Sequence, residues 1–143
     1  MTPLVALALA SADGAPSTSP QAALVEAAVQ VVRDYYAAVS RRDYRGAYAI
    51  WHGHQDYSHF RRGYAQTVRV HVRPLPPFRI EGAAGSAYAD VRVRVDASLR
   101  SGKRQHFVGN YVLRRVNDIP GSTAEQRQWR IIDAHLRKVP AGG

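Results

Sequence analysis

The sequence predicts an α+β fold in which amphipathic helices pack on one face of a curved antiparallel sheet. Apolar residues first recur with the period of a helix, and after residue 66 they alternate with polar residues, as in half-buried strands. Helices that precede a run of strands are typical of α+β folds. The chain has 143 residues, which is enough for one domain with a sizeable core.

Three helices are expected before the sheet. The first covers residues 21–40, and its apolar stripe includes Leu24, Ala28, Val31, Tyr35 and Val39. Ser19 and Pro20 provide a cap and a first-turn proline for it. Asp43 is expected to cap a second helix at Tyr44–Trp51, and Ser58 a third that carries Phe60 and Tyr64.

Five strands are expected in the rest of the chain. They cover residues 67–74, 78–81, 87–100, 104–117 and 128–139. Valines alternate with polar residues in the first and third, so one sheet face is expected to be covered and the other polar. Ser101-Gly102 predicts a hairpin turn, and Ser122–Glu125 resembles a capping box inside the loop before the last strand.

The charge of the chain is strongly positive, with a formal net charge of +9 and a pI of about 10.5. Lys103 and Lys138 are the two lysines among 20 basic residues, so 18 are arginines, and no basic run exceeds two residues. Nucleic-acid binders usually cluster their basic residues, so nucleic acid is disfavoured as a partner. The absence of cysteine excludes a disulfide framework, cysteine-rich zinc sites and thiol nucleophiles.

The chain is expected to divide into three parts. Residues 1–20 combine an apolar run, the small-residue triplet Ala10-Ser11-Ala12 and a Pro/Ser-rich stretch, which is typical of a signal-peptide remnant and a linker. A domain at 21–139 and a tail at 140–143 follow. This organisation favours a periplasmic or extracellular location, with the cytoplasm as the alternative because no basic residue precedes the apolar run. No transmembrane span is expected.

A family resemblance rests on the segment Tyr35-Tyr-Ala-Ala-Val-Ser-Arg-Arg-Asp-Tyr-Arg-Gly-Ala-Tyr48 and on Trp129-Arg-Ile131. With the expected order of elements, these residues resemble the nuclear transport factor 2-like (NTF2-like, cystatin-like) superfamily, including its SnoaL-like bacterial members. Ser40 stands where the family's motif usually has Asn. The resemblance covers roughly residues 22–136. It implies a cone-shaped sheet that curls around the first helix, with a pocket at the open end, but no particular activity.

The steroid-isomerase-like branch of this superfamily uses a tyrosine, an oxyanion-hole acid and a carboxylate base. The resemblance places the tyrosine at Tyr35, but it places Phe107 where the acid should lie, and the base position falls near His59, with Asp56 as the nearest acid. That chemistry is therefore disfavoured. A small lyase or isomerase with Tyr35 and His59 as an acid–base pair remains an alternative.

Three of the six histidines lie in the segment Trp51-His-Gly-His-Gln-Asp-Tyr-Ser-His-Phe60. His52 and His54, with Asp56 or His59, have the residue types of a zinc site. Zinc normally needs three or four protein ligands, and this spacing around Gly53 fits a polar loop over a pocket better. Neither a metal nor a cofactor is expected, and the useful question is whether His59 faces the pocket or the solvent.

The leading functional hypothesis is a non-catalytic domain with an aromatic pocket for a small apolar ligand. Positions on helix inner faces and on pocket-facing pleats of the sheet make the pocket candidates Tyr35, Trp51, Phe60, Tyr64, Phe107 and Tyr111.

A third hypothesis concerns the polar sheet face. Arg69, Arg73, Arg92 and Arg94 alternate with valines and are expected to share this face with His71. Such a face either docks an anionic partner or, where acids such as Asp90 and Asp96 interleave, pairs two copies of the chain as a homodimer.

Overall fold

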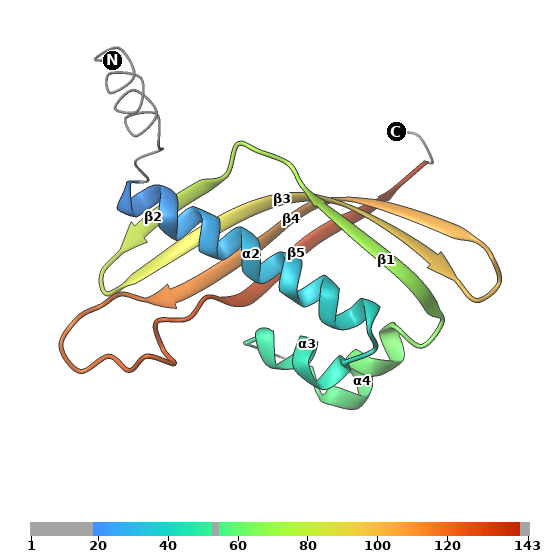
Figure 1. The fold of residues 1–143 in the computed structure, drawn as a ribbon, viewed down its shortest axis with the longest axis horizontal. Coiled ribbons are helices and arrows are strands. Elements are labelled where there is room, and N and C mark those ends of the chain that lie inside the picture. The colour runs from blue at the N-terminus through green and yellow to red at the C-terminus, as the bar shows by residue number, and fades with distance from the viewer. Residues whose placement is uncertain (1–18, 53–54, 141–143) are drawn as a thin grey trace, which may run out of the picture.

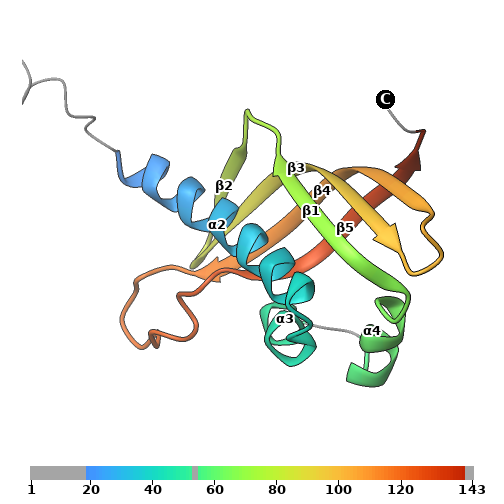
Figure 2. The ribbon, with the colours of Figure 1, turned by 45° about the vertical axis from the view of Figure 1, so that its right-hand side comes forward.

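The α+β prediction is confirmed in a computed structural model, which describes residues 19–52 and 55–140. The elements are α2 (Pro20–Ser40), α3 (Tyr44–Ile50), α4 (Tyr57–Gly63), β1 (Thr67–Pro74), β2 (Arg79–Ala83), β3 (Ser86–Leu99), β4 (Arg104–Val116) and β5 (Arg130–Val139). The expected leader segment and His54 lie outside the described residues. In the views of Figures 1 and 2, α2 lies across one face of the sheet, with α3 and α4 near its C-terminal end.

The sheet is antiparallel, and its strand order is β1-β3-β4-β5, with β2 also paired to β3. Successive residues of a strand point to opposite faces, so the two faces differ in composition. The face towards α2 carries the core residues Val91, Val93, Val95, Tyr111, Leu113 and Ile131. We call this the inner face and the opposite one the outer face.

The first helix buries the apolar stripe that the sequence predicts. Ala28, Val32, Tyr35, Tyr36 and Val39 are all buried against the inner face. Its start is fixed by Ser19, whose side chain accepts a hydrogen bond of 3.0 Å from the Ala22 N–H. This cap satisfies one of the backbone donors that every helix N-terminus leaves free.

The second helix begins as predicted at Asp43, whose Oδ1 accepts from the Gly46 N–H at 2.9 Å. We expect Asp43→Ala to lower the free energy of unfolding by about 1 kcal/mol, because one part-buried helix donor loses its partner. Urea denaturation measures the change. Asp43→Asn is the control, since asparagine caps equally well and should recover most of the loss. Equal losses in both variants would mean that the cap is not the cause.

The third helix begins two residues earlier than expected. Asp56, not Ser58, is the N-cap, and its Oδ1 accepts from the His59 N–H at 2.7 Å. Aspartate and serine are both good N-caps. Which of the two caps α4 depends on the path of the chain that leads into the helix. Asp56 therefore has a structural role as the cap of α4.

Two sequence expectations in the sheet region are wrong in detail. Val68 was expected on the covered face, but the β1–β3 register shifts between Thr67 and Arg69, and Val68 is 42% exposed. Such a bulge moves one side chain out of the alternation. The capping box in the β4–β5 loop involves Thr123 and Gln126, each of which donates its backbone N–H to the other's side chain, rather than Ser122 and Glu125.

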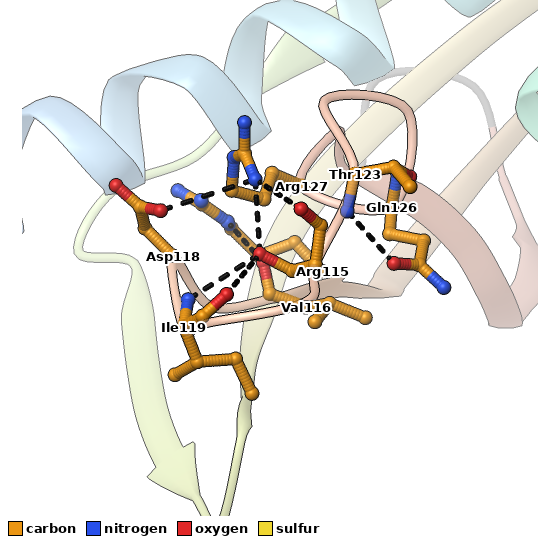
Figure 3. Close-up of polar contacts among 8 residues, drawn as sticks. Arg115, Val116, Asp118, Ile119, Thr123, Gln126 and Arg127 are labelled. Atoms are coloured by element: carbon orange, nitrogen blue, oxygen red, sulfur yellow. Dashed lines mark hydrogen bonds and ion pairs between the residues drawn. The ribbon is translucent and has the colours of Figure 1, made fainter.

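The β4–β5 loop is held by its own polar contacts, which Figure 3 shows. The Ser122 hydroxyl donates to the Ile119 carbonyl at 2.8 Å, and the Arg127 guanidinium donates to the Ser122 carbonyl at 2.8 Å. These bonds satisfy backbone groups that no strand neighbour reaches.

Across the described ranges, no helix combines the length and apolar character needed to cross a bilayer.

Candidate functional site

A cavity of about 400 Å³ lies between the helices and the inner face of the sheet. Its walls come from the C-terminal part of α2, the α3–α4 connection, α4 and the inner pleats of four strands. The lining residues most important here are aromatic: Tyr35, Tyr36, Trp51, Phe60, Tyr64, Phe107 and Tyr111. A volume of this size is typical of small-molecule sites.

All six aromatic residues that the sequence predicts for a pocket line this one cavity. Two periodicities bring them together. Tyr35 lies on the inner stripe of α2, while Phe107 and Tyr111 lie four residues apart on the inner face of β4, opposite Val95 and Val91. Tyr36, which also faces the cavity, completes the set.

The four tyrosine hydroxyls converge inside the cavity. Tyr35 Oη lies 2.8 Å from Tyr64 Oη, and Tyr36 Oη is hydrogen-bonded to Tyr111 Oη. Each pair uses one of its two hydroxyl protons. A side-chain hydrogen bond between Tyr64 and Tyr36 acts to lower the pKa of Tyr36, and this bond would use one more proton. Of the four hydroxyl protons, at least one is therefore not used within the tyrosine network.

Trp51 adds a further donor. It follows α3 directly and is held by a bridge to Ile131, with the His52 N–H donating to the Ile131 carbonyl at 2.8 Å. Its indole N–H lies near the Tyr35 hydroxyl and acts to lower the pKa of Tyr35. The indole nitrogen is nevertheless buried without a well-formed hydrogen bond. A buried donor without a partner costs about 1–3 kcal/mol. An acceptor in the cavity would recover part of that cost.

Burial raises the pKa of all four tyrosines, Tyr35, Tyr36, Tyr64 and Tyr111. Burial raises these pKa values because a phenolate loses its hydration inside the cavity. The pKa of Tyr36 is raised further by the nearby Tyr35, because two negative charges would repel each other. These groups are therefore neutral donors at physiological pH. The cavity presents O–H and N–H groups rather than charges.

These raised pKa values predict a delayed alkaline titration. The unfolded chain loses its tyrosine protons near pH 10, whereas the four tyrosines of the folded cavity keep theirs to higher pH. The free energy of unfolding that these tyrosines contribute is therefore full below pH 10 and falls as the pH rises further. We expect phenolate absorbance from four of the eight tyrosines to appear only when the protein unfolds. A stopped-flow pH jump separates prompt from delayed ionisation. Prompt ionisation of all eight would contradict the buried network.

His59 lies at the rim of the cavity, and it faces both the pocket and the solvent. The structure records no hydrogen bond between the described side chains of His59 and Tyr35, and the Tyr35 hydroxyl is paired with Tyr64. Among the described lining residues there is no Asp, Glu, Lys or Arg.

The comparisons with known proteins concern the fold. A search of solved structures finds an NTF2-like superfamily protein from Salmonella enterica subsp. enterica serovar Typhimurium str. LT2, with a TM-score of 0.54 over 80% of this chain and 89% of that chain. The chain has an NTF2-like fold. The two sequences are 16% identical, so the likeness shows the fold alone. No protein-family model and no curated protein matches the chain.

The four predicted arginines all lie on the outer face of the NTF2-like sheet. Arg69, Arg73 and Arg92 are exposed, whereas the Arg94 side chain is 13% exposed and forms an ion pair with Asp96 at 3.2 Å. Asp96 also contacts His106 Nδ1 at 2.6 Å, and this hydrogen bond, aided by Arg94, lowers the pKa of Asp96. Homodimerisation through this face stays a prediction.

Several residues that line the cavity were not among the sequence candidates. Gln55 and Gln105 line the cavity, and so do Ala134 and Leu136 of β5. The two β5 residues follow the alternation of that strand, which is a usable signal. Gln105 likewise follows the alternation of β4 with Phe107 and Tyr111, whereas Gln55 carries no such signal because its placement depends on the α3–α4 connection. No group of three metal-ligating side chains occurs within residues 19–52 and 55–140.

Proposed function

We propose that this protein binds a small, neutral, mainly apolar molecule in the aromatic cavity and performs no chemistry on it. The observation that carries the proposal is the lining itself: aromatic walls, four tyrosine hydroxyls, one indole N–H and no Asp, Glu, Lys or Arg among the described lining residues. An apolar body suits the walls, and burial contributes about 25 cal/mol per Å² of apolar surface.

The donors inside the cavity further define the ligand. At least one hydroxyl proton is not used within the tyrosine network and the Trp51 N–H has no well-formed hydrogen bond, so a ligand that carries an oxygen acceptor, such as a ketone or ester carbonyl, fits better than a hydrocarbon. A carboxylate fits poorly, because the described lining residues include no Lys or Arg to offset its desolvation.

Three matched naphthalene derivatives test this ligand class by isothermal titration. Acetylnaphthalene carries the carbonyl, ethylnaphthalene lacks it, and naphthoate carries a charge. We expect the ketone to bind about tenfold more tightly than the hydrocarbon, which corresponds to one net hydrogen bond, and naphthoate to bind least. Equal affinity for all three would reject a role for the donors.

Neighbouring residues of β5 provide a matched pair of variants that test the location. Ala134 lines the cavity and His135 is exposed on the outer face, so Ala134→Leu narrows the cavity whereas His135→Leu does not. We expect only Ala134→Leu to weaken ketone binding, by at least about tenfold. Parallel losses would place the binding site elsewhere.

His59 distinguishes binding from catalysis. A lyase or isomerase with His59 and Tyr35 remains the alternative, and its one favourable observation is that both residues line the cavity. Under the binding proposal, His59→Ala leaves the affinity for the ketone within about twofold, because the imidazole lies at the exposed rim. Turnover of any screened carbonyl compound that His59→Ala abolishes would overturn the binding proposal.

A further inference from the structure

The outer face of the sheet has a second hollow, separate from the aromatic cavity. It has a volume of about 400 Å³ and lies over β3 and β4, between the β1–β2 connection and β5. Its charged lining residues are Arg79, Arg92, Arg137 and Asp90. Three positive charges and one negative charge leave a net charge of +2. Leu75, Pro77 and Val108 supply apolar wall beside these charges.

The acids of the outer face already have partners. Asp96 pairs with Arg94 and His106, and Asp133 lies 3.1 Å from His135. Asp90 accepts a hydrogen bond from Asn110 Nδ2 at 2.8 Å. Within the described ranges, neither Arg92 nor Arg137 has an acid within 4.0 Å, and Arg79 reaches Glu81 only at 4.0 Å on the surface.

The strand register also brings like charges together. Arg73 lies directly opposite Arg94 in the β1–β3 pair, and Arg137 of β5 lies opposite Val108, which in turn faces Arg94. Like charges opposite each other across strands are destabilising. Arg94 is offset by Asp96, whereas Arg92 and Arg137 of the hollow have no acid within 4.0 Å among the described residues, so an anion bound beside them should stabilise the fold.

We propose that this hollow binds the phosphate group of a small phosphomonoester. A phosphomonoester carries a charge of about −1.5 to −2 at pH 7, which matches the net charge of the hollow. Guanidinium groups bind phosphate oxygens through paired, charge-assisted hydrogen bonds. The organic part of the ligand lies against Leu75, Pro77 and Val108. This site is independent of the aromatic cavity and of the function proposed for it.

The test uses phenyl phosphate as the probe, with inorganic phosphate and benzoate for comparison, at constant ionic strength. The variant Arg92→Gln/Arg137→Gln removes two charges from the hollow. Arg69→Gln/Arg104→Gln is the matched control, because both residues lie on the outer face beside Ser98, outside the hollow. Both variants lose the same net charge, so they separate a site from general attraction.

We expect phenyl phosphate to raise the melting temperature of the wild type and to bind more tightly than benzoate. The affinity should fall at least about tenfold in Arg92→Gln/Arg137→Gln and by less than about twofold in the control. Asp90→Asn, which removes the carboxylate from the wall, should tighten binding several-fold.

Three results would overturn the proposal. Equal losses in both double variants would indicate diffuse electrostatic attraction. Benzoate binding as tightly as phenyl phosphate would remove the preference for phosphate. Retention on vesicles that contain phosphatidic acid, with no binding of soluble phenyl phosphate, would assign the face to a membrane surface instead.

Discussion

Gly109→Ala should lower the free energy of unfolding by about 3 kcal/mol, the largest effect that we expect from a single substitution. A Cβ at this position would lie 1.8 Å from the carbonyl oxygen of His135 and 2.8 Å from the Cα of Leu136. Both are backbone atoms, so a flexible side chain cannot make room. Strand β5 would have to move away from β4, and Leu136 of the cavity wall would move with it.

Gly82→Ala is the matched control, since Gly82 also lies in a strand and has nothing within 4 Å of the added Cβ. It should be neutral or stabilise the protein by up to about 1 kcal/mol, through the entropy of the unfolded chain. Chemical denaturation of both variants provides the comparison. Equal stabilities would show that the close approach of β4 and β5 is not required.

The second large effect concerns the hydrogen-bonded pair Tyr36 and Tyr111. Tyr36→Phe and Tyr111→Phe should each cost about 1–3 kcal/mol, because each leaves the other hydroxyl buried without this partner. The double variant should cost less than the sum of the two single variants by about 1 kcal/mol, since it removes both hydroxyls together. Urea denaturation of the four proteins in the cycle measures this coupling.

Tyr88→Phe controls for the loss of a tyrosine hydroxyl as such. Tyr88 lies on the outer face and is only half-buried, so its substitution should change stability by less than about 0.5 kcal/mol. Strict additivity of the two cavity substitutions would mean that the two hydroxyls do not interact in solution.

The periodicity of the sequence predicted the parts of the fold that depend on which face a residue occupies. The helical stripe placed Tyr35, and the strand alternation placed Phe107 and Tyr111 on the inner face. The same alternation placed Arg92 on the outer face. Because the periodicity of a strand or helix assigns all of its residues to faces together, a correctly identified periodicity places several residues at once.

Features that depend on registers between elements could not be predicted in this way. The pairing of Tyr36 with Tyr111 joins residues 75 positions apart. The hollow of the outer face needs Arg79, Arg92 and Arg137 from three strands, and only Arg92 was a sequence candidate. The wrong N-cap of α4 has a local cause, because Asp56 and Ser58 are both able to cap this helix. Only the tertiary path of the chain selects between the two residues.

The most direct test of the aromatic cavity as a ligand site uses its indole N–H. The chain has two tryptophans, so a proton–nitrogen correlation spectrum contains two indole signals, which Trp51→Phe assigns. Trp51 lines the cavity and Trp129 does not. Titration with acetylnaphthalene should shift the Trp51 indole signal in proportion to binding and leave that of Trp129 in place. Binding of the ketone that leaves the Trp51 signal unmoved would contradict the account.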